Sequence, residues 1–309
     1  MARSRGRGRK RGLKGLLQRS ARVLRWTFRI LLLLLILDLA YLGLTWPDWS
    51  KLASGPIPKS AFMREYEKRQ VDDRDLPRLR WQPVALTTIP RHMQRAVILA
   101  EDSRFYEHSG FDLIAFREAM DYNLEKGRFV FGASTISQQT VKNLFLTPSR
   151  NPLRKWHELI LTWGMEQSLR KRRILEIYLN VAEFGPGLYG VQAATQAYWG
   201  LNADQLSPAE AAQLVATLPS PVKHNPATHT RYFERRSKKL LALLERYPGD
   251  AAEAVRPRPF ELSLPPDNGH ELWPAESDSA SEGEAEIPPP EVKNEYPPVE
   301  ERSIRPTPP

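Results

Sequence analysis

The longest apolar run in the chain lies near its start, at residues 28–46. Eleven of the 15 residues from 30 to 44 are Leu or Ile. A helix of this length spans about 28 Å, close to the hydrocarbon thickness of a bilayer. Asp38 interrupts the run at a cost of roughly 3 kcal/mol, which the leucines outweigh. We expect a tolerated carboxylate that reaches toward the interface, with a helix–helix contact or a functional group as the alternatives. The pattern predicts one transmembrane helix at 28–46, with Trp26 and Trp46 at the two membrane surfaces.

After this run the apolar positions follow a helical period, and strand-like alternation is scarce. Residues 47–84 are polar and contain several prolines, so we interpret them as a connector with one short helix at 61–69. Residues 91–200 are predicted to be mostly helical, with helices at 151–169, 171–180 and 190–198, a break at 185–187, and two more helices at 207–219 and 231–247. Asn151 and Ser207 resemble helix caps, because each is followed by proline at the first helical position. The pattern predicts a mainly helical domain at 85–248.

Charge is distributed unevenly along the chain. The first 29 residues hold eleven Lys or Arg and no acidic residue. Such an arm could bind nucleic acid, but directly before a transmembrane helix it favours the cytoplasmic side under the positive-inside rule. We therefore predict a cytoplasmic basic arm at 1–27, with the rest of the chain on the outer side of the membrane. A cleaved signal peptide is the alternative, but its apolar core would be shorter and followed by small residues at a cleavage site.

The other end of the chain, at 249–309, is acidic and rich in proline. Residues 256–309 hold 13 of the 27 prolines, and from Asp267 onward there are eleven acidic residues and only three basic ones. Little apolar material is left to form a core, so we predict a disordered tail, whose purpose the sequence does not reveal. The chain has no cysteine, which excludes a disulfide framework and a cysteine metal site.

Two short segments carry candidate chemistry. EDSRFYEHSGF at 101–111 places a pair of carboxylates, Glu101 and Asp102, at the end of an apolar helical run. GASTISQQTVKN at 132–143 opens a second helix, and its Thr135 and Gln138 have capping-box spacing, which would leave N–H groups at a positive helix end for an anion. An acid or base beside an anion site suits group transfer from a phosphorylated sugar. Taken alone, Glu101 could equally be a helix-end carboxylate paired with Arg104.

Three further motifs complete an ordered set of five. They are RKxxE at 154–158, KxxILExYLN at 171–180 and GxxxAxxxYWG at 190–200. The five motifs in this order resemble those of the peptidoglycan glycosyltransferases, glycosyltransferase family 51, over about residues 85–230. Two positions depart from the family pattern. Ser137 replaces the usual threonine, and WGL at 199–201 replaces the usual Phe-Gly-Lys, which removes a charge.

The resemblance implies a mainly helical, lysozyme-like catalytic domain with a small membrane-associated lobe. It implies a protein of the bacterial cytoplasmic (inner) membrane whose catalytic domain lies on the periplasmic face and polymerises lipid II into β-1,4-linked glycan strands. The transfer would invert the anomeric carbon and release undecaprenyl pyrophosphate. Partners would be lipid II, the growing strand and proteins of cell-wall synthesis or division.

The same motifs give the residues expected at the site. The catalytic pair is Glu101, as general base, and Glu158, which assists the pyrophosphate side but also has the spacing of a salt bridge with Arg154. The expected substrate-binding residues are Ser134, Thr135, Gln138, Gln139, Lys142, Asn143, Arg154 and Lys155. The expected supporting residues are Asp102, Phe105, His108, Gly110, Lys171 and Glu176, with His108 bracing the loop of Glu101 and Glu176 in the scaffold. The apolar residues at 111–116 and 129–131 could form core or the membrane-associated lobe.

No organic cofactor and no nucleic acid is expected. Mg²⁺ or another divalent cation at the pyrophosphate is a hypothesis, since no compact ligand cluster demands one. Two SxxK patterns, at 168–171 and 220–223, match one transpeptidase motif, but the other transpeptidase signatures are absent, so we expect a monofunctional enzyme. Two alternatives stay open: a lysozyme-like hydrolase that uses Glu101 as a general acid, and an inactive scaffold that acts through its tail.

Overall fold

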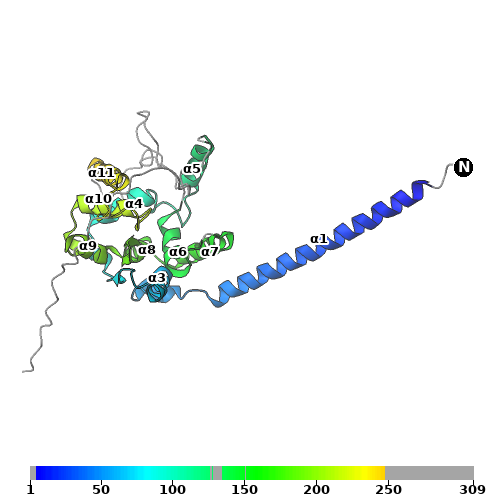
Figure 1. Ribbon diagram of the computed structural model, residues 1–309, viewed down its shortest axis with the longest axis horizontal. Helices are drawn as coiled ribbons and strands as arrows, with labels where there is room; N and C mark the ends of the chain where they lie inside the picture. The colour runs from blue at the N-terminus through cyan, green and yellow to red at the C-terminus, as the bar shows by residue number, and fades with distance from the viewer. Residues whose placement is uncertain (1–4, 126, 128–133, 150, 248–309) are drawn as a thin grey trace, which may run out of the picture. The chain divides into compact units, whose positions relative to one another are not determined.

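The computed structural model describes residues 5–247 apart from 126, 128–133 and 150 (Figure 1). The helices are α1 (Arg5–Leu44), α2 (Trp49–Ser54), α3 (Ala61–Asp72), α4 (Arg91–Glu101), α5 (Leu113–Glu125), α6 (Ile136–Phe145), α7 (Pro152–Ser168), α8 (Lys171–Val181), α9 (Val191–Trp199), α10 (Pro208–Thr217) and α11 (Arg231–Arg246). The strands are β1 (Arg80–Trp81), β2 (Glu183–Gly185) and β3 (Leu188–Tyr189), and η1 (Leu86–Thr88) and η2 (Ala203–Gln205) are 3₁₀ turns. The predicted mainly helical fold is confirmed. The tail at 249–309 and the apolar residues 129–131 lie outside the described residues.

Helix α8 forms the centre of the helical domain. It lies between α6 and α9 (Figure 1). Its apolar side chains from Ile174 to Val181 are buried, while its first turn is basic and partly exposed. Helix α6 packs against both α7 and α8, while α4 packs against α10 and α11. The motif segments are therefore brought together by helix packing around this core.

The helix caps predicted from the sequence are confirmed. The side chain of Asn151 accepts a hydrogen bond from the Arg154 N–H at 2.6 Å, and α7 begins at the following proline. Ser207 caps α10 in the same way, with a reciprocal bond from Glu210 that completes a capping box. Each cap satisfies N–H groups that the first helical turn leaves without partners.

Helix α1 begins earlier than residue 28, where the sequence analysis placed the start of the apolar helix. It starts at Arg5, because the basic arm is rich in good helix formers and contains no proline. Within it, Arg22–Leu44 is long and apolar enough to cross a membrane, judged by length and composition. Trp46, expected as the last residue of the span, lies beyond the helix end, because Pro47 disfavours helical geometry at the residue before it.

The segment at 47–84, interpreted from the sequence as a connector, contributes to the core of the domain. It supplies α2, α3 and β1. Trp49, Leu52, Met63 and Tyr66 are buried and belong to the main apolar cluster. The short helix expected at 61–69 extends to Asp72. Apolar residues spaced along this segment thus anchor it against α6 and α7.

A small sheet joins β1, β3 and β2 in that order. The β1 strand pairs with β3 in parallel, and β2 pairs with β3 in antiparallel register. The strands have only two or three residues, too few for an alternating pattern to reveal them. The predicted break at 185–187 is the turn between β2 and β3. Gly187 has a φ of 70° there, and a Cβ would stand 2.8 Å from the Tyr66 hydroxyl oxygen, so the position favours glycine.

Candidate active site

Glu101 is the last residue of α4, and two other helices hold its carboxylate. Its Oε2 accepts a hydrogen bond from Nε2 of Gln139 on α6 at 2.9 Å. Its Oε1 accepts one from Nη2 of Arg236 on α11 at 3.2 Å. The side chain is 13% exposed, so the carboxylate can still be reached from solvent. The pairing with Arg104 that the local sequence allows is not made, since Arg104 turns to Asp112.

Gln139 is oriented in turn by Tyr178 of α8. The tyrosine hydroxyl donates a hydrogen bond to Oε1 of Gln139 at 3.2 Å, which leaves Nε2 to face Glu101. Burial, assisted by the nearby charge of Glu101, raises the pKa of Tyr178 well above its usual value, so its hydroxyl keeps its proton. A chain of hydrogen bonds from the core therefore sets the direction in which Glu101 points.

Asp102 turns away from this carboxylate and into the protein. Its Oδ1 lies 2.9 Å from Nε2 of His108, and its Oδ2 accepts a hydrogen bond from the Ile136 N–H at 2.9 Å. Nδ1 of His108 accepts the Gly110 N–H at 3.2 Å, so the imidazole hydrogen lies on Nε2 and points at Asp102. Gly110 has a φ of 96°, and a Cβ there would stand 2.9 Å from Thr162. These contacts brace the loop that follows Glu101.

The N-terminus of α6 is closed by groups of the protein itself. Thr135 and Gln138 form a reciprocal capping box, and both are buried. Asp102 occupies the positive end of the helix through the Ile136 N–H, where a carboxylate is favoured. Asp102 thus supplies a negative charge at the helix end where the sequence analysis expected an anion, and Thr135 and Gln138 form the cap, while their binding of substrate stays a prediction. Ser134 is exposed directly before it.

Glu158 of α7 forms ion pairs with two basic side chains. Its side chain is only 3% exposed, and its Oε2 lies 2.9 Å from Nη1 of Arg154, which realises the i,i+4 spacing. Lys155 pairs with Oε1 through its ammonium group. The lysine is 44% exposed, so its outer side stays open to a ligand. One buried carboxylate thus holds two positive groups at the edge of the site.

Lys142 of α6 lies among these charges. Burial lowers the pKa of Lys142, the charges of Glu158 and Glu101 partly offset this, and Arg154 and Lys155 oppose them. Within the described part of the chain its ammonium group makes no hydrogen bond or ion pair. A desolvated cation without such a partner is costly unless an anion joins it.

The charges around Lys142 do not cancel. Glu101, Glu158, Arg154 and Lys155 act on Lys142, and Arg236 is bonded to Glu101. These six side chains together carry a net charge of +2. Asp102, next to Glu101 in the sequence, points to His108 and the start of α6, and including its charge would lower the sum to +1. An arrangement of this kind suits a ligand with more than one negative charge.

A second polar cluster joins α6, α7 and α8. Glu166 accepts a hydrogen bond from the Ser137 hydroxyl and pairs with Nζ of Lys171 at 2.7 Å. The same ammonium group lies 4.4 Å from the ring centroid of Phe105, which is fully buried. Ser137 therefore uses the hydroxyl that it shares with the threonine it replaces.

Two further residues expected at the site, Glu176 and Asn143, lie outside the two polar clusters just described. Glu176 accepts the Leu86 N–H at 3.0 Å and pairs with Arg173 at 2.8 Å, so it ties α8 to η1. Asn143 is half-buried beside Lys142 on α6. The structure thus gives Glu176 a place in the scaffold and brings both glutamates of the expected catalytic pair close enough to influence the charge of one lysine, Lys142.

One group of side chains has the composition of a metal site. Ligand atoms of Asp102, His108 and Asp112 lie within 4.8 Å of one another. Each of them already has a protein partner: Asp102 holds His108 and Ile136, and Asp112 holds Arg104. The hydrogen on Nε2 of His108 also occupies the position that a metal would need. This donor set fits internal bracing better than an ion.

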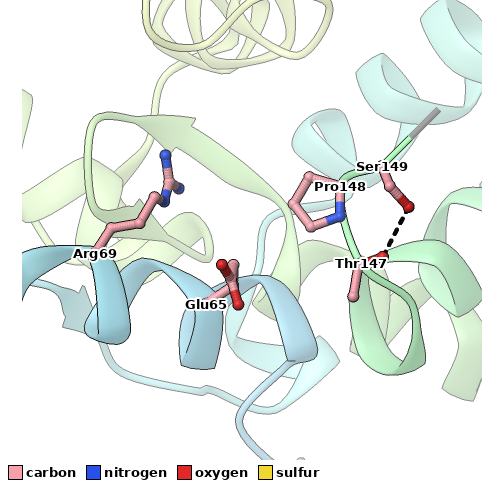
Figure 2. A pocket seen from close by; sticks show the side chains of 5 residues that line it. All are labelled: Glu65, Arg69, Thr147, Pro148 and Ser149. Atoms are coloured by element: carbon pink, nitrogen blue, oxygen red, sulfur yellow. Dashed lines mark hydrogen bonds between the residues drawn. The ribbon is translucent and has the colours of Figure 1, made fainter.

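A pocket of about 400 Å³ opens between α3 and the loop after α6 (Figure 2). Glu65 and Arg69 line one side from α3, and Thr147, Pro148 and Ser149 line the other. The hydroxyl groups of the threonine and the serine are 2.9 Å apart. None of the residues expected at the catalytic site lines this pocket, so the geometry around Glu101 is the better guide to the chemistry.

Helix α5 exposes apolar side chains. Leu113, Ile114, Phe116 and Leu124 are all exposed, with Leu113 at 75%. The sequence left open whether residues 111–116 form core or the membrane-associated lobe, and Leu113, Ile114 and Phe116 do not form core. An exposed apolar surface of this kind is typical of an interaction site.

Arg236 was not expected from the sequence. It belongs to a helix with many basic residues and lies outside the five motifs. One signal could have identified it: α11 buries Phe233, Ser237 and Leu240, and residue 236 falls on the same side of the helix. A charged residue on a buried helical face usually has a partner there.

Comparison with known proteins gives a consistent result. A family model described as Transglycosylase matches residues 70–245. A biosynthetic peptidoglycan transglycosylase of Azoarcus sp. is 47% identical over 165 residues, which cover 53% of this chain and 71% of the relative. Proteins of the same name from Nitrosospira multiformis and Laribacter hongkongensis are 42% identical over 184 residues (59% and 79% covered) and 37% identical over 221 residues (70% and 95% covered).

Proposed function

Because the chain belongs to the family of monofunctional peptidoglycan transglycosylases, glycosyltransferase family 51, we propose that it joins lipid II units into β-1,4-linked glycan strands. The observation that carries this proposal is the half-buried cation Lys142, which lies near two carboxylates in a cluster of six charged side chains with a net charge of +2. Lipid II presents a sugar hydroxyl as acceptor and a sugar pyrophosphate as donor. The cluster offers a base for the first and cations for the second.

Glu101 acts on the acceptor side. Both of its oxygens accept hydrogen bonds, from Gln139 and Arg236, which is the arrangement of an ionised carboxylate. The 4-hydroxyl of the acceptor sugar loses its proton to Glu101 while its oxygen bonds to the anomeric carbon of the donor. The bond from that carbon to the pyrophosphate oxygen breaks in the same step, and the configuration inverts.

The cations on the other side receive the departing pyrophosphate. Lys142 lacks a partner among the described residues, and Lys155 keeps an open outer face, so both can bind phosphate oxygens as negative charge develops. Glu158 holds Arg154 and Lys155 in place and offsets their mutual repulsion. Its role is therefore to position the cations and not to take the proton.

We propose that the site does not require a divalent cation. Coordination by Glu158 would have to compete with Arg154 and Lys155, which already pair with both of its oxygens. The positive charge that Mg²⁺ would supply is supplied by side chains. We therefore assign the stabilisation of the leaving group to Lys142, Arg154 and Lys155.

Helix α1 would anchor the enzyme at the membrane that holds its substrate. The apolar span Arg22–Leu44 and the basic arm before it support a single-pass anchor with a cytoplasmic N-terminus. The exposed apolar residues of α5 would lie against the lipid surface. The catalytic domain would then face the periplasm, where strands of peptidoglycan are extended.

The test uses the full-length protein in detergent with labelled lipid II, and products are separated by size. Wild-type protein should produce long strands that muramidase digests. Glu101→Gln should lower the rate by roughly 100-fold or more, because general-base catalysis typically contributes 10²–10⁴-fold. Glu107→Gln is the matched control, since Glu107 is near in sequence but 48% exposed and paired with Arg104.

Each outcome has a separate meaning. Retention of more than about a tenth of the wild-type rate in Glu101→Gln excludes Glu101 as the base. Cleavage of preformed glycan without polymer formation would favour the lysozyme-like hydrolase. Inactivity of the wild-type protein in both assays would favour the scaffold.

A further inference from the structure

Asp38, within the apolar part of α1, binds α7. Its Oδ1 lies 2.7 Å from Nε2 of His157, and its Oδ2 accepts a hydrogen bond from Nε1 of Trp156 at 3.1 Å. Asp38 is 16% exposed and His157 is 13% exposed, although neighbouring residues of α1 are open. The tolerated, interface-seeking carboxylate that the sequence suggested is therefore a contact between two helices.

More of α1 and its continuation belong to this contact. Leu42, one turn after Asp38, is 4% exposed in a helix whose other apolar residues are mostly exposed. The ring of Tyr41 lies 5.9 Å from that of His157. Beyond the helix, Trp46 packs on Gly164 of α7, where an added Cβ would stand 2.6 Å from the indole. The contact is continuous and has polar and apolar parts.

The turn of α7 that receives Asp38 also carries the charges of the donor side. Trp156 and His157 stand in sequence between Lys155 and Glu158. Successive side chains of a helix project about 100° apart, so one face of this turn can bind the anchor while another faces Lys142. Any displacement of the turn would move Glu158 and its cations with it.

We propose that Asp38 is a positioning residue for the donor side of the site. Its bonds to Trp156 and His157 dock the anchor on α7 and so set where Glu158 and its paired cations stand relative to a lipid-linked pyrophosphate. The inference rests on the proposed membrane anchor and lipid II substrate.

The depth of the contact agrees with such a role. Asp38 precedes the end of α1 by six residues, or about 9 Å along the axis, so the docked turn lies inside the apolar layer near its edge. The pyrophosphate of a lipid-linked sugar lies at the adjoining headgroup level. A carboxylate is costly in hydrocarbon, and the two donors of α7 satisfy both of its oxygens there. Leu153 and Trp163 of the same helix are exposed and apolar, as contact with lipid requires.

Docking is tested by cross-linking in membranes. The chain has no cysteine, so introduced pairs have no background. A short thiol-reactive cross-linker should join Asp38→Cys to His157→Cys. The matched pair Ile36→Cys with His157→Cys should stay unjoined, because residue 36 projects about 200° away from residue 38. Equal joining of the two pairs, or none for the first, would overturn the docking.

Positioning is tested by the kinetics of the full-length protein in liposomes with labelled lipid II. Asp38→Leu keeps the span apolar, and we expect its KM to rise about tenfold or more with kcat changed by less than about threefold. Asp38→Asn keeps one acceptor oxygen and should show a smaller rise. The exchange of Asp38→His with His157→Asp restores a pair and should recover most of the loss. Gly43→Ala is the control, since nothing lies within 4 Å of the added Cβ.

The measurements on Asp38→Leu test the positioning role of Asp38 separately from the proposed polymerase function. An unchanged KM in Asp38→Leu would overturn positioning even if the cross-link forms. If the wild-type protein made no polymer, the proposed function would fail, and the affinity of labelled lipid II would become the readout. Weaker binding by Asp38→Leu than by wild type would then support the inference, and equal binding would overturn it.

Discussion

Replacing Arg236 with methionine should lower turnover while leaving the proposed base in place. Arg236 donates to Oε1 of Glu101 at 3.2 Å, and the two side chains are 15% and 13% exposed. A hydrogen bond between charged groups contributes about 1.5–3 kcal/mol, and the lower half of that range applies because both groups keep some solvent. At about 1.4 kcal/mol per factor of ten, kcat/KM should fall roughly 10- to 40-fold. Methionine preserves much of the length of the side chain, so packing of α11 is largely retained.

The assay compares initial rates of lipid II polymerisation with thermal melting of the same samples. Arg235→Met is the matched control, because Arg235 is the preceding residue of α11 and is exposed. Arg236→Lys should fall between the two, since lysine keeps the charge but lacks the planar fork of arginine. A variant with normal melting and reduced turnover would locate the effect at Glu101.

Two results would refute this reasoning. Arg236→Met with at least half of the wild-type kcat/KM would show that the hydrogen bond does not hold Glu101 in its working position. An equal loss in Arg235→Met would show that the effect comes from the charge of the helix as a whole.

Three further predictions follow from the same structure. Burial lowers the pKa of Lys142, so its charge is lost as pH rises through that lowered value. Lys142→Arg stays charged, so the alkaline fall of its kcat/KM should begin at a higher pH than in wild type. If kcat/KM of the two proteins fell at the same pH, Lys142 would not belong to the donor site. Burial raises the pKa of Glu183 from 4.5 to about 7, so the folded state keeps a proton between those values that the unfolded state releases. Stability should therefore fall by about 3 kcal/mol as pH rises through this window, and urea unfolding of Glu183→Gln should lack that fall. Removal of divalent cations with EDTA should leave the turnover of purified enzyme within about twofold of its starting value, since Lys142, Arg154 and Lys155 supply the charge. A loss of turnover that only Mg²⁺ restores would contradict this assignment.

The features that the sequence predicted well are local. The cap formed by Asn151 depends on the Arg154 N–H, three residues away, and the box at Thr135 depends on Gln138. Such contacts are decided by residues within one helical turn, so the sequence carries nearly all the information. The salt bridge between Arg154 and Glu158 was predictable for the same reason.

The features that it missed join distant segments. Gln139 and Arg236 lie 38 and 135 residues from Glu101, and their contacts exist only because α4, α6 and α11 pack together. Asp38 is 119 residues from His157. A periodic pattern shows which face of a helix is apolar, but it does not show which helix covers that face.

The N-terminus of α6 could bind either an anion of the substrate or a carboxylate of the protein, and the position of Asp102 bears on which of the two it binds. Had the helix end been open, a pyrophosphate could have bound its N–H groups, as the sequence suggested. Asp102 binds the Ile136 N–H, so the negative charge there belongs to the protein. Under the proposed function, side chains hold the anion of the substrate, and Lys142 is the half-buried cation available for it. This also separates transfer from hydrolysis: a glycan-cleaving enzyme has no pyrophosphate to bind and would gain nothing from a desolvated lysine beside its carboxylates.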